Sequence, residues 1–203
     1  MKKKRVKLKH PVTYYGMPNV AGLMTAPKSH EHTPVFFTRM WAMPNHETFL
    51  IPPVKQLVAR YVGNGKNWAD PFSGANSPAQ YTNDHNPSMP AKHHMEAVKF
   101  CKEVLKGKRL DGVLFDPPYS FRQVSEHYKM LGKKATPKDT SMLFYEKVKS
   151  AVCDKVRPGG YAISFGWNTN GFGVTRGFRI VEIMTLAHGG SKNDTIIVVE
   201  KKI

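Results

Sequence analysis

The chain has 203 residues, which is enough for a single domain that buries its own hydrophobic core. Hydrophobic residues make up 40% of it, as in ordinary globular proteins, whereas the formal net charge of +16 is unusual and indicates a polyanionic partner. No apolar run approaches the roughly 18 residues of a transmembrane helix, and no signal-peptide core follows the basic N-terminus, so we expect a cytoplasmic protein without a membrane partner.

Residues 1–33 begin with a cluster of lysine and arginine side chains and show no sustained hydrophobic period. We expect a flexible basic arm, which is either a solvated tail or a segment that contacts phosphates. A single domain is expected over residues 34–203.

The next segment is more apolar and predicts a helix. Pro53 suits a first helical position, and the helical spacing is carried by Val54, Leu57, Val58 and Tyr61. The loop before it, with Thr48 and Phe49, is less easily explained as core.

Residues 67–87 contain two short strand signals, each of which ends in an acidic residue. Asp70 ends the first and is followed by Phe72 and Gly74, and Asp84 ends the second. A strand, a glycine turn and a second strand with a terminal acid is the skeleton of a nucleotide-type cofactor site, in which the second acid accepts from ribose hydroxyls. The spacing leaves room only for a turn between the two strands.

Glu96 precedes an apolar pattern that predicts a helix packed on the sheet. It falls where a third strand would end, and there it could accept a hydrogen bond from an adenine amino group. The alternative is an exposed glutamate at the start of the helix.

The central motif follows the buried strand predicted over residues 113–115. Asp116 falls at the carboxyl end of that strand, where open α/β sheets bind their ligands. Pro117 and Pro118 fix the backbone and remove two donors, which leaves carbonyl acceptors pointing outward. With Tyr119 as a stacking ring, the motif suits a planar ligand that carries an exocyclic amine. A strand stopped by prolines, with Asp116 as a helix cap, is the alternative.

Basic and aromatic residues alternate over residues 120–140, which favours contact with nucleic acid. The candidate contacts there are Phe121, Arg122, Lys129, Lys133 and Lys134. Further on, the pattern predicts a helix from about residue 142, a buried strand over 161–165, and an antiparallel hairpin at the edge of the sheet. Loops of this region supply the further candidates Trp167, Asn168, His188, Lys192 and Asn193.

Cys101 and Cys153 are the only cysteines, and neither belongs to a metal-binding or redox motif. We expect two reduced, mostly buried thiols. His93 and His94 are adjacent and would point to opposite faces of a strand, so we predict no structural metal.

The order of these parts resembles the amino-group class of S-adenosylmethionine-dependent DNA methyltransferases, in particular the small adenine-N6 enzymes common in phages and prophages. The matching pieces are Met43-Pro44-Asn45 with Thr48-Phe49, Asp70-Pro71-Phe72, Thr82-Asn83-Asp84 with Asn86-Pro87, Met95-Glu96-Ala97, Asp116-Pro117-Pro118-Tyr119, Ser164-Phe165-Gly166-Trp167-Asn168 and His188-Gly189-Gly190 with Asn193-Asp194-Thr195. The resemblance covers roughly residues 36–201.

The resemblance implies a Rossmann-like α/β fold with a seven-stranded, mostly parallel sheet whose last strand is antiparallel. It also implies S-adenosyl-L-methionine as the cofactor. Asp70, Phe72 and Gly74 would line its methionine end, Asp84 would hold the ribose and Glu96 the adenine amine, and Thr48 and Phe49 would close over it. Catalysis would fall to Asp116, Pro117, Pro118 and Tyr119, with Asp116 also beside the cofactor.

The chain departs from this family in three respects. Glu96 stands where an aspartate is commoner, Ala75-Asn76 replace the second glycine of the cofactor loop, and no large target-recognition domain is present.

The implied activity is methylation of the adenine N6 amine in DNA, in the host cytoplasm if a phage encodes the protein. A role in shielding phage DNA from restriction would follow. Two alternatives stay open: a methyltransferase acting on adenine N6 or guanine N2 in RNA, and an inactive nucleic-acid-binding protein on the same fold.

Overall fold

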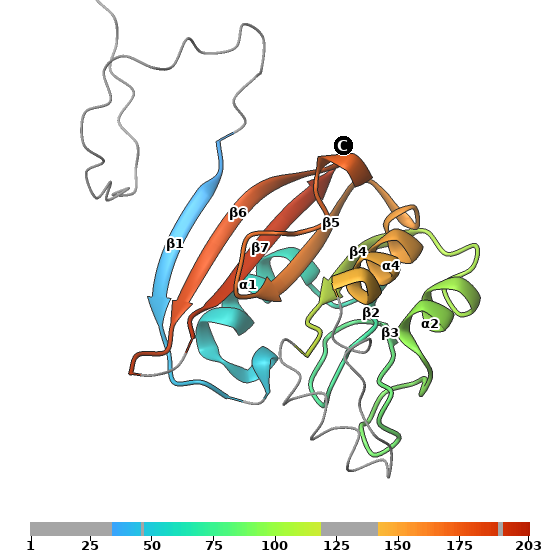
Figure 1. Ribbon diagram of the computed structural model, residues 1–203, viewed down its shortest axis with the longest axis horizontal. Helices are drawn as coiled ribbons and strands as arrows, with labels where there is room; N and C mark the ends of the chain where they lie inside the picture. Colours follow the sequence, from blue (N-terminus) through green and yellow to red (C-terminus); the bar gives the residue numbers. More distant parts are fainter. Residues whose placement is uncertain (1–33, 46, 119–141, 191–192) are drawn as a thin grey trace, which may run out of the picture.

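The computed structural model describes residues 34–45, 47–118, 142–190 and 193–203. Seven strands of this part of the chain form one sheet in the order β1-β6-β7-β5-β4-β2-β3 (Figure 1). The strands are β1 (Phe36–Trp41), β2 (Trp68–Asp70), β3 (Tyr81–Thr82), β4 (Leu110–Phe115), β5 (Val156–Gly166), β6 (Phe178–Ala187) and β7 (Thr195–Lys202).

Strand β7 is antiparallel to both of its neighbours, β5 and β6, whereas the other neighbouring strands are parallel. This confirms the predicted seven-stranded sheet with an antiparallel last strand. The β6–β7 hairpin is also confirmed, but its expected place at the sheet edge is wrong. Strand β7 inserts beside β5, and β1 adds beyond β6, with Phe36 opposite Glu182 and Trp41 opposite Ala187.

The two strands predicted over residues 67–87 are present as β2 and β3, with turns and no helix between them. The strand expected to end at Glu96 is absent. Only an isolated bridge between Asn83 and His93 marks its place. Pro87 and Pro90 interrupt this segment, and proline cannot donate to a strand ladder.

Helices cover both faces of the sheet. They are α1 (Pro52–Val62), α2 (Ala97–Glu103) and α4 (Met142–Cys153), with short 3-10 turns η1 (Thr48–Leu50) and η3 (Val174–Arg176). In the ranges described, no helix is both long enough and apolar enough to cross a membrane.

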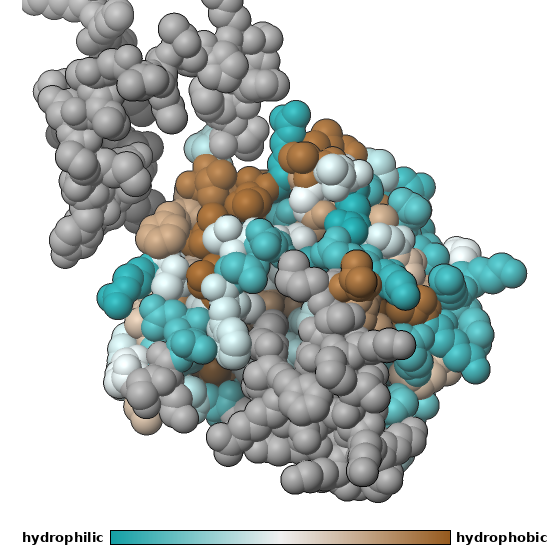
Figure 2. All heavy atoms as spheres, viewed as in Figure 1, coloured by the Kyte–Doolittle hydropathy of each residue, from teal (hydrophilic) through white to brown (hydrophobic). Residues whose placement is uncertain are grey.

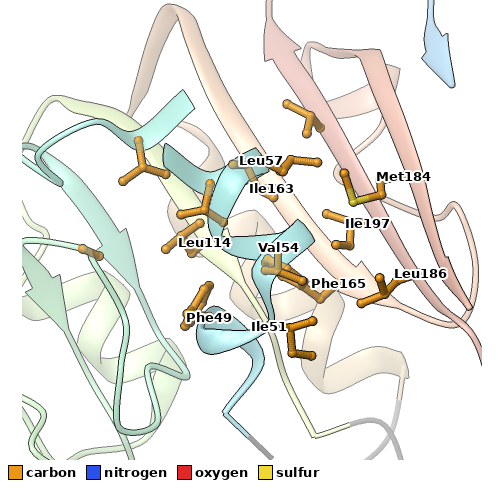
Figure 3. Packing of buried hydrophobic residues seen from close by; sticks show 14 of the residues in the cluster. Phe49, Ile51, Val54, Leu57, Leu114, Ile163, Phe165, Met184, Leu186 and Ile197 are labelled. Atoms are coloured by element: carbon orange, nitrogen blue, oxygen red, sulfur yellow. The ribbon is translucent and has the colours of Figure 1, made fainter. Parts of the chain in front are cut away.

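Alternation along β4 separates the two halves of the core. Leu114 packs with Val54 and Leu57 of α1, together with Ile163, Met184 and other side chains of β5, β6 and β7 (Figure 3). The side chains on either side of it, Val113 and Phe115, join the residues of α2 and α4 on the opposite face. Both faces of β4 are therefore buried, as expected for a central parallel strand.

Cys101 and Cys153 lie in the second half of the core as free, buried thiols, which confirms the sequence prediction. Burial raises the pKa of Cys101 to about 12 and also raises the pKa of Cys153. Neither thiol is therefore expected to be reactive near neutral pH.

A buried glutamate fixes α1 across the sheet. Glu182 on β6 is 1% exposed and accepts hydrogen bonds from Arg60 Nη2 and from the Tyr61 hydroxyl, each at 2.7 Å. Burial and the bond to this carboxylate raise the pKa of Tyr61. These hydrogen bonds link the end of α1 to a strand far away in the sequence. Each oxygen of the buried carboxylate has a hydrogen-bond donor.

Gly65 lies in the connection between α1 and β2, where its carbonyl accepts from the backbone N–H groups of Trp68 and Gln80. Its φ is +77°, and a Cβ there would lie 1.8 Å from the carbonyl oxygen of Pro78. Gly107 has a similar φ of +69° but nothing within 4 Å of the same position.

Gly65→Ala should therefore destabilise the protein more than Gly107→Ala. The control should lose about 1–2 kcal/mol from its left-handed backbone alone, and Gly65→Ala should lose a further ~1–3 kcal/mol because backbone atoms must move. Urea unfolding of both variants measures the difference. Equal losses would show that the Pro78 carbonyl moves away freely.

Candidate active site

Three aspartates gather at the carboxyl edge of the parallel strands. Asp70 ends β2, Asp84 follows β3 and Asp116 follows β4, and β2 lies between the other two strands. The charges of Asp116 and Asp84 both act on Asp70 and raise its pKa. The structure thus brings together three of the residues that the sequence singled out, at the edge of the sheet where α/β folds bind ligands.

Asp70 shapes the loop that follows β2. Its side chain is fully buried, with Oδ1 accepting from the Phe72 N–H at 2.9 Å and Oδ2 from the Ser77 hydroxyl at 2.6 Å. Burial is the main reason why its pKa rises to about 7, although the two hydrogen bonds act in the opposite direction. Asp70 therefore changes charge near neutral pH.

Asp84 connects the loops after β2 and β3. Its Oδ2 accepts from the Gly74 N–H at 3.1 Å and its Oδ1 from the Asn86 N–H at 2.8 Å, and the residue is 8% exposed. Gly74 has a φ of +52°, a conformation that favours glycine, and space is open where a Cβ would stand. The glycine turn predicted from the sequence is thus present, and the carboxylate predicted to hold a ribose orders it.

Buried polar atoms without a partner mark the same region. Among the described residues these are Ser73 Oγ, Asn86 Nδ2 and Ser164 Oγ. Ser73 and Asn86 belong to the loops after β2 and β3. Ser164 lies on β5, opposite Phe115 at the end of β4. Because buried polar groups are normally hydrogen-bonded, these atoms fit a site that receives a polar ligand.

The Asp116-Pro117-Pro118 loop is held by helix α4. The Tyr145 hydroxyl donates to the carbonyl of Pro118. No hydrogen bond to the Pro117 carbonyl occurs within the described ranges, and Asp116 is partly exposed. The contact with Tyr145 therefore ties the loop after β4 to helix α4.

An aromatic cluster joins this loop to the loop after β2. Phe72 meets Phe115 edge to face at 5.4 Å and Tyr145 at 6.2 Å, and Phe115 meets Tyr145 at 6.3 Å. Phe115 directly precedes Asp116, so the two loops share one apolar support. Tyr145 lies in the helix predicted from about residue 142, and no local signal in the sequence points to its hydroxyl contact.

Glu96 caps helix α2. Its side chain accepts from the N–H groups of Val98 and Lys99, both at 3.0 Å, and the residue is exposed. These contacts match the alternative of a glutamate at a helix start. Its contact with a cofactor adenine remains a prediction.

Phe49 belongs to the hydrophobic core. It is 8% exposed and meets Phe165 edge to face at 5.6 Å (Figure 3). The side chain thus packs near the end of β5, and its closing over a cofactor remains a prediction. Thr48, beside it in η1, is half-buried.

The loop after β5 and the β6–β7 turn contain the other described candidates. Trp167, 47% exposed, and the exposed Asn168 follow β5 at the same edge of the sheet as Asp116. Asn193 is also exposed. His188, in contrast, is buried, with its ring nitrogens 2.9 Å from the Ala42 carbonyl and the Thr195 hydroxyl. These contacts give His188 a structural role, and they lend no support to contact with nucleic acid.

Several predicted site residues lie outside the described residues. They are Tyr119, Phe121, Arg122, Lys129, Lys133, Lys134 and Lys192. Over the described ranges, no group of three or more histidine, cysteine, aspartate or glutamate side chains could hold a metal ion.

Comparison with solved structures identifies the fold. TrmN from Thermus thermophilus matches with a TM-score of 0.51 and 15% identity, over 76% of this chain and 49% of its own. The N-methyltransferase NodS from Bradyrhizobium japonicum WM9 matches with a TM-score of 0.46 and 11% identity, over 73% of this chain and 93% of its own. The chain thus spans about half the length of TrmN. No family model and no curated protein matches the sequence.

The chain therefore has the Rossmann-like fold of S-adenosylmethionine-dependent methyltransferases. At these levels of identity the likeness establishes the fold alone, so the activity must be argued from the site.

Asp70→Asn should stabilise the protein at about pH 8 but not at about pH 4. Folded Asp70 keeps its proton to about pH 7, whereas in the unfolded chain it ionises near the ordinary aspartate pKa of 3.8. Between these values the unfolded state therefore binds fewer protons, and the stability of the folded protein falls as pH rises. At roughly 1.4 kcal/mol per pKa unit, the gain at high pH is at most about 4 kcal/mol. Urea unfolding at both pH values measures it.

Asp111→Asn is the matched control with the opposite sign. The Arg157 guanidinium, 2.5 Å away, lowers the pKa of Asp111, so its contribution is present above the ordinary aspartate pKa and is lost on acidification. This variant should be less stable than the wild type at about pH 8. A loss of stability in Asp70→Asn at that pH would contradict the assignment of a raised pKa.

Proposed function

We propose that the protein transfers a methyl group from S-adenosylmethionine to the N6 amine of adenine in DNA. The observation that carries the proposal is the position of the Asp116-Pro117-Pro118 loop, beside the carboxylate-ordered loops of Asp70 and Asp84 at one edge of the sheet. Catalytic acceptors and a cofactor site must be adjacent for direct transfer between two bound molecules.

The residues of the β2 and β3 loops fit this cofactor chemically. A sulfonium nucleoside carries positive charge, which the carboxylates of Asp70 and Asp84 favour, and the unpartnered Ser73 Oγ and Asn86 Nδ2 can bond to its polar groups. Gly74 lets the backbone come close to the ligand. When bound, the cofactor supplies an electrophilic methyl group.

Asp116 and Pro117 would prepare the amine for attack. The lone pair of an aromatic amine is delocalised into the ring, which makes it a weak nucleophile. Two acceptors, the Asp116 carboxylate and the Pro117 carbonyl, would accept hydrogen bonds from its two N–H groups and so localise the lone pair on nitrogen. Because the prolines and Tyr145 fix the loop, this arrangement needs little reorganisation during the reaction.

A base in duplex DNA cannot reach the acceptors of Asp116 and Pro117 while it is stacked. The target adenine must therefore be flipped out, at a cost of a few kcal/mol. Trp167, which is exposed at the same edge of the sheet, would support an extruded base, and the net charge of +16 favours the phosphate backbone. Tyr119 would stack on the base, as the sequence motif predicts.

Methyl transfer from labelled S-adenosylmethionine to duplex DNA and to transcribed RNA, assayed side by side, tests the proposal. Transfer to DNA with modified adenine as the product supports it, and such DNA should resist a restriction enzyme that adenine methylation blocks. Transfer to RNA alone would favour the RNA enzyme. Cofactor binding undetectable by calorimetry, together with nucleic-acid binding, would favour an inactive binding protein.

Asp116→Ala should lower the rate of methyl transfer by about 10²–10³-fold, because one of the two acceptors on the amine is lost. S-adenosylmethionine binding, measured by calorimetry, should change far less. Glu103→Ala, at an exposed position on α2, is the control and should keep both properties. Equal loss of transfer and cofactor binding in Asp116→Ala would count against the assigned role.

Tyr145→Phe removes only the hydroxyl that holds the Pro118 carbonyl and keeps the ring contacts with Phe72 and Phe115. We expect kcat to fall by about tenfold, the equivalent of one hydrogen bond of roughly 1.4 kcal/mol, with the KM for S-adenosylmethionine unchanged. A parallel rise in this KM would indicate a general loss of structure. Single-turnover rates and thermal melting separate the two results.

A further inference from the structure

Strand β1 is an exposed edge with bulky apolar side chains on both faces. All six of its residues are exposed, and the exposed fractions are 67% for Phe36, 62% for Phe37 and 63% for Trp41. β1 stands at the end of the sheet, and no described strand pairs with its outer side (Figure 1). Figure 2 shows a hydrophobic area on this side of the molecule. Such edges are templates for pairing with another strand.

The composition of β1 is typical of a protein–protein interface. Its sequence, FFTRMW, contains three aromatic residues, a methionine and one arginine, residue types that are enriched at interfaces. Arg39 is its only charged residue in a chain of net charge +16. A surface that binds nucleic acid would carry several lysine or arginine side chains, whereas this strand carries only Arg39.

The direction of the backbone groups in β1 follows from one hydrogen bond. The Ala42 N–H donates to the Ala187 carbonyl of β6 at 3.1 Å. Because N–H groups alternate in direction along a strand, those of the even-numbered residues of β1 point toward β6. The N–H and carbonyl groups of Phe37, Arg39 and Trp41 therefore point outward.

We propose that β1 pairs antiparallel with β1 of a second copy of this chain, about a two-fold axis at Thr38. Outward-pointing residues must lie opposite one another, a condition that an axis through any residue of the strand meets. An axis at Thr38 or Arg39 pairs five residues of the strand with one another, and an axis at Phe37 or Met40 pairs only three. At Arg39 the two guanidinium groups would be directly opposed, which is unfavourable. At Met40, residues 36–38 would all lie opposite residues beyond the end of the strand, whereas at Thr38 only Trp41 would do so, opposite Val35.

The axis at Thr38 gives favourable pairs over residues 36–40 of the strand. Phe37 lies opposite Arg39 of the second copy, Phe36 opposite Met40, and Thr38 opposite itself. Aromatic residues attract a guanidinium and the sulfur of methionine, and threonine pairs are favourable across strands. An isologous contact of this kind closes as a dimer and leaves no free copy of the edge.

The size of the contact suits a dimer. At about 150–250 Å² for a fully buried aromatic side chain, the exposed parts of Phe36, Phe37 and Trp41 in two copies supply roughly 600–900 Å². The strand backbones, Val35, Met40 and Met43 add to this, which approaches the ~1,200 Å² at the lower end of specific interfaces. The two-fold axis reverses the strand direction, so the two sites would lie at opposite edges of one continuous sheet.

Sedimentation equilibrium of the nuclease-treated full chain tests the proposal. The wild type and Thr38→Val should sediment as dimers. Thr38→Lys and Thr38→Glu should each weaken association by at least about tenfold, because like charges meet on the axis, and an equimolar mixture of the two should restore the dimer. Thr38 is exposed in the single chain, so these changes should leave folding and methyl transfer intact.

Cysteine cross-linking tests the register. Thr38→Cys should form a disulfide between copies, because directly opposed residues of a non-hydrogen-bonded pair lie about 4.5 Å apart. Arg39→Cys, whose two copies lie diagonally at about 7–8 Å, should cross-link far less.

A wild-type monomer at tens of micromolar, a dimer unaffected by Thr38→Lys, or stronger cross-linking at position 39 would overturn the proposal. A monomer with β1 amides protected from hydrogen exchange would mean that another segment of the same chain covers the strand, and would overturn it as well.

Discussion

The crowding of three aspartates at one edge of the sheet is the constraint on which the site depends. Parallel strands place their carboxyl ends together. The negative charges of Asp84 and Asp116 therefore act on Asp70. Burial and mutual repulsion make the ionised form of Asp70 costly, and hydrogen bonds from Phe72 and Ser77 offset only part of that cost. This arrangement favours binding of a positively charged ligand, because the positive charge offsets the repulsion between the carboxylates.

The same edge is stiffened by aromatic packing. Phe72, Phe115 and Tyr145 link the loop after β2 to the Asp-Pro-Pro loop, and the Tyr145 hydroxyl holds the Pro118 carbonyl. The Asp-Pro-Pro loop and the loop after β2 therefore share one aromatic support. Rigid placement matters here because the proposed chemistry depends on aligning an amine with a methyl group and not on a strong acid or base.

The topology that builds this edge leaves a different feature at the far side of the sheet. Strand β7 inserts between β5 and β6, and β1 covers the outer side of β6. The carbonyl of Ala42 and the buried imidazole of His188 connect β1 to the turn that joins β6 and β7. The consequence is a well-anchored but exposed strand, whose aromatic residues have no counterpart within the described part of the chain.

The sequence by itself determined the parts that depend on local pattern: the short strands ending at Asp70 and near Asp84, the helix beginning near Pro53, the β6–β7 hairpin and the Asp-Pro-Pro loop after a buried strand. Apolar periodicity, proline and glycine specify these within a few residues. Only the tertiary structure decided that Phe49 is core, that His188 is buried and that Tyr145 holds the Pro118 carbonyl. The partners of Phe49, His188 and Tyr145 lie far away in the sequence; the bond between His188 and Ala42 spans 146 residues. Glu96 is a different case, because its hydrogen bonds are local and because Pro87 and Pro90 interrupt the competing strand. Local patterns do not specify which distant segments meet, since that is set by how the whole sheet and its helices pack.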